Sequence, residues 1–117
     1  MKKRSTYRLK ENSFLARIAA WKLNSRQVAI VFGNTIHLHN TSRESFLANK
    51  KWLLHELKHI DQFNQYGFAR FIFLYLIESF KNGYANNKYE IEAREAEEPN
   101  LKLQTNTIHN EYLEHKE

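Results

Sequence analysis

Two histidines and a glutamate near the middle of the chain have the types and spacing of a metal-dependent hydrolytic centre. His55, Glu56 and His59 form the pattern HExxH within residues 52–63. On an α-helix, residues four apart lie on the same face, so both imidazoles can reach one ion. Glu56 then lies beside the ion, where its carboxylate can accept a proton from a water molecule. We therefore interpret His55 and His59 as metal ligands and Glu56 as a general base.

The residues around this pattern are typical of an amphipathic helix. Apolar side chains recur at intervals of three and four, with lysines between them. These apolar residues are Leu53, Leu54, Leu57 and Ile60. Asn49 is a candidate N-cap, and the helix is expected to end near Gly67, which suits a C-terminal cap. The competing interpretation is a solvated helix face that carries two ordinary histidines.

A catalytic zinc ion needs one more ligand, because such ions normally have three protein ligands and one open position. The chain has no cysteine, so any transition metal must be held by histidine and carboxylate. Glu90 and Glu92 are the candidates, since both lie in a helix-forming segment that follows the motif. The apolar segment 68–80 lies between the motif and these two glutamates and would fold the chain back towards the motif. Glu90 and Glu92 both remain candidates for the third ligand.

Composition indicates one globular domain. The 117 residues are 42% hydrophobic and 14% aromatic, which is not the composition of a disordered chain. The net charge of +5 would permit contact with nucleic acid or an anionic membrane, but the cations are spread along the chain without a recognition motif. We expect no specific nucleic-acid binding. No apolar run is long enough to span a bilayer, and charges interrupt any signal segment, so a cytoplasmic location is expected.

The order of predicted elements gives an α+β fold. Helices are expected over residues 13–23, from about 41 in a short segment, over the motif, over 68–80 as a buried helix, and over 90–98 before Pro99. The apolar run 28–32 and the alternating run 35–39 are expected to form a β-hairpin, since Gly33 and Asn34 are typical of a turn. The domain is therefore predicted as 13–99, mostly helical with one small hairpin packed against the HExxH helix. Residues 1–12 are expected to be a flexible basic arm and 100–117 a C-terminal tail.

This order of strand, HExxH helix and downstream glutamate helix resembles the gluzincins, the thermolysin-type zinc peptidases. It resembles more closely a small HExxH peptidase-like domain of bacterial toxin-associated and injection-system proteins. The resemblance covers about residues 14–98 and is carried by residues 32–38, 52–62 and 87–93. It implies a minimal zincin-like domain with zinc (Zn²⁺) at His55 and His59, Glu56 as general base and Glu90 as third ligand.

One position departs from the family pattern. Gluzincins commonly have an Asp four residues after the third ligand, where it supports a ligand histidine, and this chain has Arg94 there. Glu92 therefore remains an alternative third ligand. Asp61 or Asn87 would take over the support of the histidine.

We expect a zinc-dependent metallopeptidase that acts on a peptide or protein substrate. The strand at 35–39 would lie at the rim of the cleft and pair with an extended substrate. Tyr84, Tyr89 or His37 would donate a hydrogen bond to the oxyanion. The alternative is a catalytically idle zinc-binding module for interaction with an effector, since the chain is short for a substrate-binding lobe. The sequence does not indicate an oligomeric state.

Overall fold

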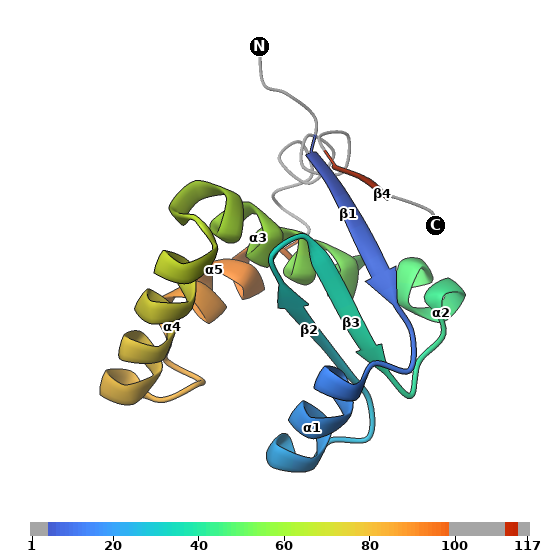
Figure 1. Cartoon of the computed structure of the whole chain (residues 1–117), viewed down its shortest axis with the longest axis horizontal. Coiled ribbons are helices and arrows are strands. Elements are labelled where there is room, and N and C mark those ends of the chain that lie inside the picture. The colour runs from blue at the N-terminus through green and yellow to red at the C-terminus, as the bar shows by residue number, and fades with distance from the viewer. Residues whose placement is uncertain (1–4, 99–111, 115–117) are drawn as a thin grey trace.

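The computed structural model describes residues 5–98 and 112–114. The elements follow the order β1 (Ser5–Lys10), α1 (Phe14–Leu23), β2 (Val28–Phe32), β3 (Thr35–His39), α2 (Arg43–Ala48), α3 (Lys50–Tyr66), α4 (Phe68–Asn82), α5 (Lys88–Glu95) and β4 (Tyr112–Glu114). Figure 1 shows the helices arranged around a small sheet. The predicted α+β class, with a hairpin packed against the motif helix, is confirmed.

The sheet has the strand order β2-β3-β1-β4. β2 and β3 form the predicted antiparallel hairpin, with Val31 opposite Ile36 and Ile30 opposite His37. β1 lies parallel to β3 on one side and parallel to β4 on the other. Among the described strands, β2 is therefore at one edge of the sheet and β3 is an inner strand.

The prediction of a flexible arm over residues 1–12 is wrong for β1. Tyr7 and Leu9 are buried and alternate with exposed neighbours, which is the side-chain pattern of a strand with one covered face. The basic residues in this segment obscured that alternation. Because β1 pairs with β3, the domain begins before residue 13. Part of the predicted C-terminal tail is also a strand, β4, which pairs with β1. Residues 1–4, the rest of the predicted tail and Pro99 lie outside the described residues.

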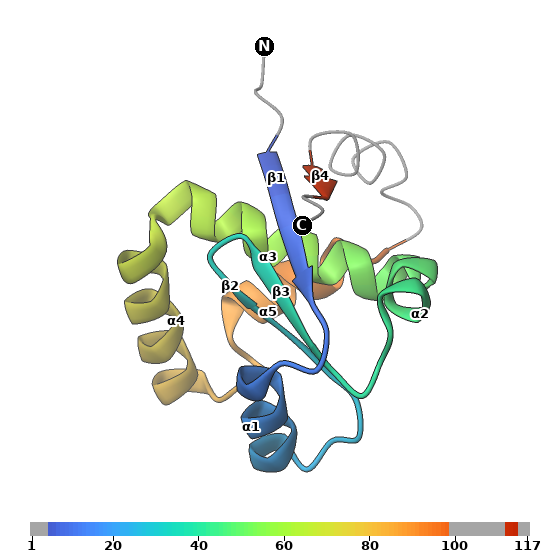
Figure 2. The same ribbon diagram turned by 45° about the vertical axis from the view of Figure 1, so that its right-hand side comes forward.

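Helices cover both faces of the hairpin. Val31, Ile36 and Leu38 point towards α3 and form the main core with Leu57 and Ile60. The opposite face packs against α1 through its alanines, in a second cluster of Val28 with Ala16 and Ala20. Figure 2 shows α3 crossing behind the strands and α1 below them. The motif helix is thus fixed by a core on its inner side.

Side chains cap the first three helices at the positions where the chain changes direction. Ser13 Oγ accepts from the Ala16 N–H, Ser42 Oγ from the Ser45 N–H and Asn49 Oδ1 from the Trp52 N–H. Such caps satisfy amide groups that have no partner within the helix. The Asn49 cap begins α3 six residues before His55 and so sets which turn of the helix carries the motif.

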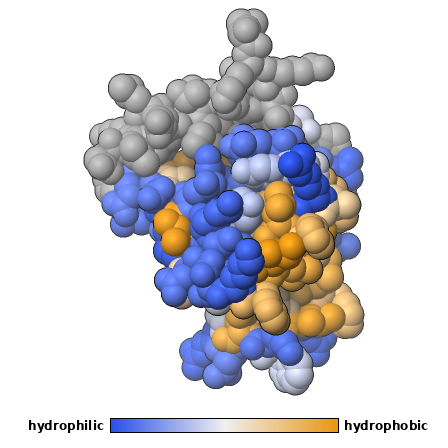
Figure 3. Space-filling model, turned by 90° about the vertical axis from the view of Figure 1, so that its left-hand side faces the viewer, coloured by the Kyte–Doolittle hydropathy of each residue, from blue (hydrophilic) through white to orange (hydrophobic). Residues whose placement is uncertain are grey.

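α4 is a helix as predicted, but the prediction that it is buried is wrong. Phe71 is its only fully buried residue, whereas Phe73, Leu76, Ile77 and Phe80 are exposed. In Figures 1 and 2, α4 leaves the end of α3 and stands to one side of the sheet. Figure 3 shows the resulting apolar area on that side of the molecule.

None of the described helices is long and apolar enough to cross a membrane.

Candidate metal centre

The three predicted ligands come from two helices that pack against each other. α3 carries His55 and His59 one turn apart, and α5 carries Glu90 in its first turn. Asn87 fixes the start of α5, because its Oδ1 accepts from the Tyr89 N–H at 2.8 Å while its side-chain N–H groups donate to α4. Those bonds to α4 end on the Tyr75 carbonyl at 3.1 Å and on Ser79 Oγ at 2.8 Å. Glu90 is therefore held facing α3.

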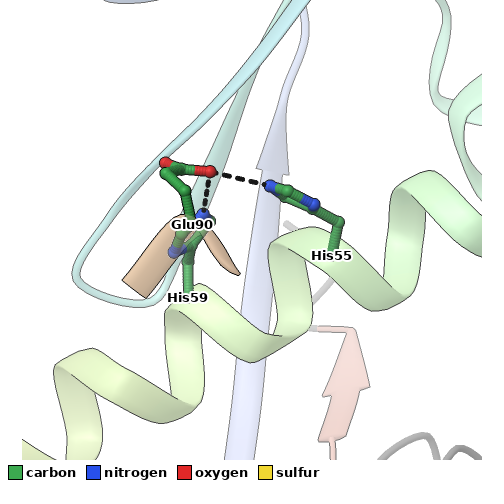
Figure 4. A group of neighbouring side chains, drawn as sticks. All are labelled: His55, His59 and Glu90. Atoms are coloured by element: carbon green, nitrogen blue, oxygen red, sulfur yellow. Dashed lines mark hydrogen bonds and ion pairs between the residues drawn. The ribbon is translucent and has the colours of Figure 1, made fainter. Parts of the chain in front are cut away.

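The imidazoles and the carboxylate meet at a single oxygen. Glu90 Oε1 lies 3.1 Å from His55 Nε2 and 3.3 Å from His59 Nε2 (Figure 4). One ligand atom from each of these residues lies within 4.8 Å of the others. Tyr75 donates to the second oxygen of Glu90 at 2.5 Å, which leaves Oε1 directed at the histidines. The structure thus brings together the set His55, His59 and Glu90.

Glu92, the alternative third ligand, lies elsewhere. Its Oε1 accepts a hydrogen bond from Gln62 Nε2 at 2.9 Å. Gln62 also donates to the Tyr89 carbonyl at 3.1 Å, which can only accept, so its amide nitrogen must face that way. The amide oxygen of Gln62 then faces His59 Nδ1 at 2.8 Å and accepts from it. With Nδ1 protonated, neutral His59 has its lone pair on Nε2, towards Glu90.

His55 is oriented in the same way by a residue that the sequence analysis did not identify. The carboxylate of Glu97 lies 2.6 Å from His55 Nδ1, and an ionised carboxylate only accepts. Nδ1 therefore carries the hydrogen and Nε2 is free to bind an ion. Asp61 and Asn87, the predicted supports, do not have this role: Asp61 forms an ion pair with Lys58 and Asn87 caps α5.

Sequence spacing contains a signal for both supporting residues. Gln62 follows His59 by three residues, which places the two side chains on one face of α3. Glu97 follows Glu90 by seven residues, about two helical turns, so both point to the same side of the segment. The His59–Gln62 contact lies within α3, whereas the contact of Glu97 with His55 can be recognised only when α5 is known to pack against α3.

The two histidine Nε2 atoms and the Glu90 carboxylate oxygen direct their electron pairs at the same point, and this arrangement shifts the pKa values of all three residues. Burial opposes a charge on His55, but the hydrogen bond that protonated His55 donates to Glu90 and the charge of Glu56 outweigh it and raise the pKa of His55 to about 9. The pKa of His59 is raised in the same way. Burial raises the pKa of Glu90, yet hydrogen bonds from both histidines outweigh it and the net direction is down. The cluster therefore needs a positive charge at its centre, either protons or a cation.

Glu56 is buried in the wall of the same pocket as the three ligands. Its side chain is only 5% exposed. Burial raises its pKa to about 7, although the charges of His59 and His55 oppose the rise. A carboxyl with a pKa near neutrality is suited to accept and return a proton.

No protein-family model, curated protein or solved structure matches this chain. The chemistry of the centre therefore has to be judged from its own residues.

A pocket of about 260 Å³ opens beside the cluster. All of β2 lines it, together with residues of α1 on one face of the sheet and of α3 and α4 on the other. The pocket therefore follows the edge of β2. The prediction that residues 35–39 lie at the rim of the cleft is wrong, because none of them lines the pocket and β3 is an inner strand between β2 and β1.

Of the three predicted oxyanion donors, the structure brings only Tyr84 to the pocket. Tyr89 is buried among aromatic rings of α3 and α4, where it contacts Tyr66 and Phe71. His37 Nδ1 is hydrogen-bonded to Ser13 Oγ at 2.8 Å on the α1 face of the hairpin. Tyr84 lines the pocket with Glu56, and burial raises its pKa to about 12, so its hydroxyl keeps its proton at neutral pH.

If His55, His59 and Glu90 hold a metal ion, replacing Glu97 with glutamine should weaken its binding by about tenfold or more, the usual effect of removing a carboxylate behind a ligand histidine. Glutamine preserves the size of the side chain but lacks the charge that holds the His55 Nδ1–H. Competition with a chelating dye measures the affinity. Glu95→Gln on the exposed side of α5 makes the same charge change and should leave the affinity within about twofold. Equal effects of the two substitutions would contradict the role of Glu97.

The metal-free protein should lose stability as the pH rises from 6.5 to about 9. The raised pKa of His55 contributes stability that is fully present below 6.5 and is lost as pH rises through about 9. Glu56, with its pKa raised from 4.5 to about 7, adds a loss in the same direction at lower pH, between about 4.5 and 7, because its buried carboxylate is costly. The loss should be at most about 3 kcal/mol for His55, measured by urea unfolding in the presence of a chelator.

Zinc should reverse this trend, since the metal competes with protons for the same nitrogens and binds more tightly at higher pH. His55→Gln should remove most of the decline in the metal-free protein. A metal-free stability that stays constant between pH 6.5 and 9 would show that the ion pairs of the cluster do not form in solution.

Proposed function

We propose that this chain is a zinc-dependent hydrolase that cleaves peptide bonds, with His55, His59 and Glu90 holding the ion. The observation that carries the proposal is the convergence of two Nε2 atoms and one carboxylate oxygen on one point. Both imidazoles are oriented by hydrogen bonds at Nδ1, so all three atoms offer electron pairs. Two nitrogens and one oxygen are a donor set that suits zinc and leaves a position open for a reactant.

In this proposal, bound zinc supplies a Lewis acid that polarises a substrate carbonyl and lowers the pKa of a water molecule. Glu56 is the group that takes the proton from that water and passes it to the leaving amine. Its buried position in the wall of the pocket that the three ligands also line suits both halves of this transfer. Tyr84 is the candidate donor to the oxygen on which negative charge develops.

The edge of β2 supports a peptide as the substrate. Among the described strands, β2 pairs with β3 only, and the pocket follows its other edge. An extended peptide can add to such an edge through main-chain hydrogen bonds, with alternate side chains entering pockets. The walls beside the ion carry Ile30, Phe32, Ile72 and Leu76, so we expect an apolar side chain to be preferred next to the cleaved bond.

The test is to incubate the zinc-loaded chain with a mixture of unfolded proteins and to identify new N-termini by mass spectrometry. We expect cleavage next to apolar residues that stops with a chelator and returns when zinc is added. Stoichiometric zinc without any new N-terminus would reject the hydrolase and favour the idle zinc-binding module. Absence of zinc binding would reject both.

A further inference from the structure

The outward face of α1 is apolar although the helix lies at the surface. Its inner face packs on the sheet through Ala16 and Ala20. Phe14, Ile18 and Trp21 lie on the opposite side of the helix, and the Trp21 side chain is 79% exposed. A surface helix of a globular protein normally has the reverse arrangement. In α1, by contrast, the small residues face the sheet and the large apolar residues face outwards.

α4 presents a second apolar face of the same kind. Phe73, Leu76 and Phe80 are exposed, Phe80 to 93%. Leu76 of α4 and Leu23 of α1 both line the pocket and are both more than half exposed. Figure 3 shows the apolar area bordered by hydrophilic surface. We call Phe14, Ile18, Trp21, Phe73, Leu76 and Phe80 the apolar rim.

Cations flank the apolar rim. Arg17 and Lys22 lie on either side of the outward face of α1, and Arg70 and Lys81 lie beside the exposed face of α4. All four are exposed, and within residues 5–98 and 112–114 none of them forms an ion pair. The single acidic residue of the two helices is Glu78, which is half-buried and accepts from Asn82 and the Lys88 N–H.

The combination of an apolar rim with flanking cations favours one kind of partner over another. A second copy of the chain would bring cations opposite cations around the same apolar centre, which is unfavourable. An anionic lipid surface offers a negative charge to each Lys and Arg and an apolar interior to Trp and Phe. Helices that lie in a bilayer surface have this combination of an apolar face, aromatic residues and flanking cations.

We infer that the apolar rim docks on the surface of an anionic membrane, with α1 and α4 lying against the headgroups. Docking itself does not require the metal centre, and a chelator should leave it unchanged.

The test is co-sedimentation of the full chain with vesicles of phosphatidylcholine alone or mixed with phosphatidylglycerol, in the presence of a chelator. Binding is expected only to the mixed vesicles, with a blue shift of the Trp21 fluorescence. Arg17→Glu with Lys22→Glu should weaken binding about thirtyfold or more. Lys50→Glu with Lys51→Glu, at exposed positions at the start of α3, makes the same net charge change and should weaken it far less.

A second pair of substitutions tests the apolar part. Trp21→Ser with Phe80→Ser removes two exposed side chains and should abolish the partition into vesicles, while circular dichroism confirms an unchanged fold. The inference is overturned if wild type does not sediment with anionic vesicles, or if the two charge variants lose binding equally. It is also overturned if the wild type forms a dimer without lipid and Trp21→Ser with Phe80→Ser makes it a monomer.

Discussion

Glu90→Ala should weaken zinc binding by more than about a hundredfold, whereas Glu92→Ala should leave most of the affinity in place. Glu90 Oε1 is the point where both histidine Nε2 atoms meet. Removing it leaves two nitrogens, which cannot form the three-ligand set of a catalytic site. The loss should exceed that caused by removing a supporting hydrogen bond, which is tenfold to a hundredfold.

Glu92 is a sharp control because it lies two residues away on the same helix and contacts the site only through Gln62. Metal content of the purified variants and competition with a chelating dye provide the measurement. His55→Ala should behave like Glu90→Ala. If Glu92→Ala loses zinc and Glu90→Ala retains it, the ligand set assigned to the pocket is wrong.

Glu56→Gln should retain zinc and lose about a thousandfold in the rate of peptide cleavage. Glutamine has nearly the same shape as glutamate but cannot accept the proton of the attacking water, and removing a general base typically costs a hundredfold to ten-thousandfold. The rate is measured on the best peptide found among the new N-termini. Zinc content determined on the same samples separates a loss of chemistry from a loss of metal.

The same substitution has a second, independent readout. The buried carboxylate of Glu56, with its pKa raised to about 7, costs stability when it is ionised. Glutamine carries no charge, so the metal-free variant should be more stable than the wild type above pH 7. Retained cleavage in Glu56→Gln would exclude its role as the base.

The parts of the fold that the sequence predicted well depend on residues close together in the chain. The hairpin follows from two short apolar runs around a turn, and α3 follows from its repeating leucines and the Asn49 cap. β1 was missed because it pairs with β3, more than twenty residues later. Only that pairing reveals the alternation of Tyr7 and Leu9 as a strand pattern.

The site residues also divide into those whose geometry a single helix fixes and those that depend on the packing of two helices. The HExxH spacing identifies His55, Glu56 and His59 without a structure, because one helix fixes their geometry. The choice of Glu90 over Glu92 needed the packing of α5 on α3, and Glu97 was found only through its contact with His55. The exposure of α4 could not be predicted, since composition shows that a helix is apolar but not what covers it.

The attachment of α4 has a consequence for motion. The glycines at its two ends, Gly67 and Gly83, have φ values of 89° and 81° and provide no side-chain cap. Only Phe71 of this helix is fully buried. The two bonds from Asn87 to Tyr75 and Ser79 add to the few contacts that hold α4, so we expect this helix to move about Gly67 and Gly83 more than α3 moves. Its amide protons should exchange with deuterium sooner than those of α3, and Asn87→Ala should make the whole wall of the pocket exchange faster still.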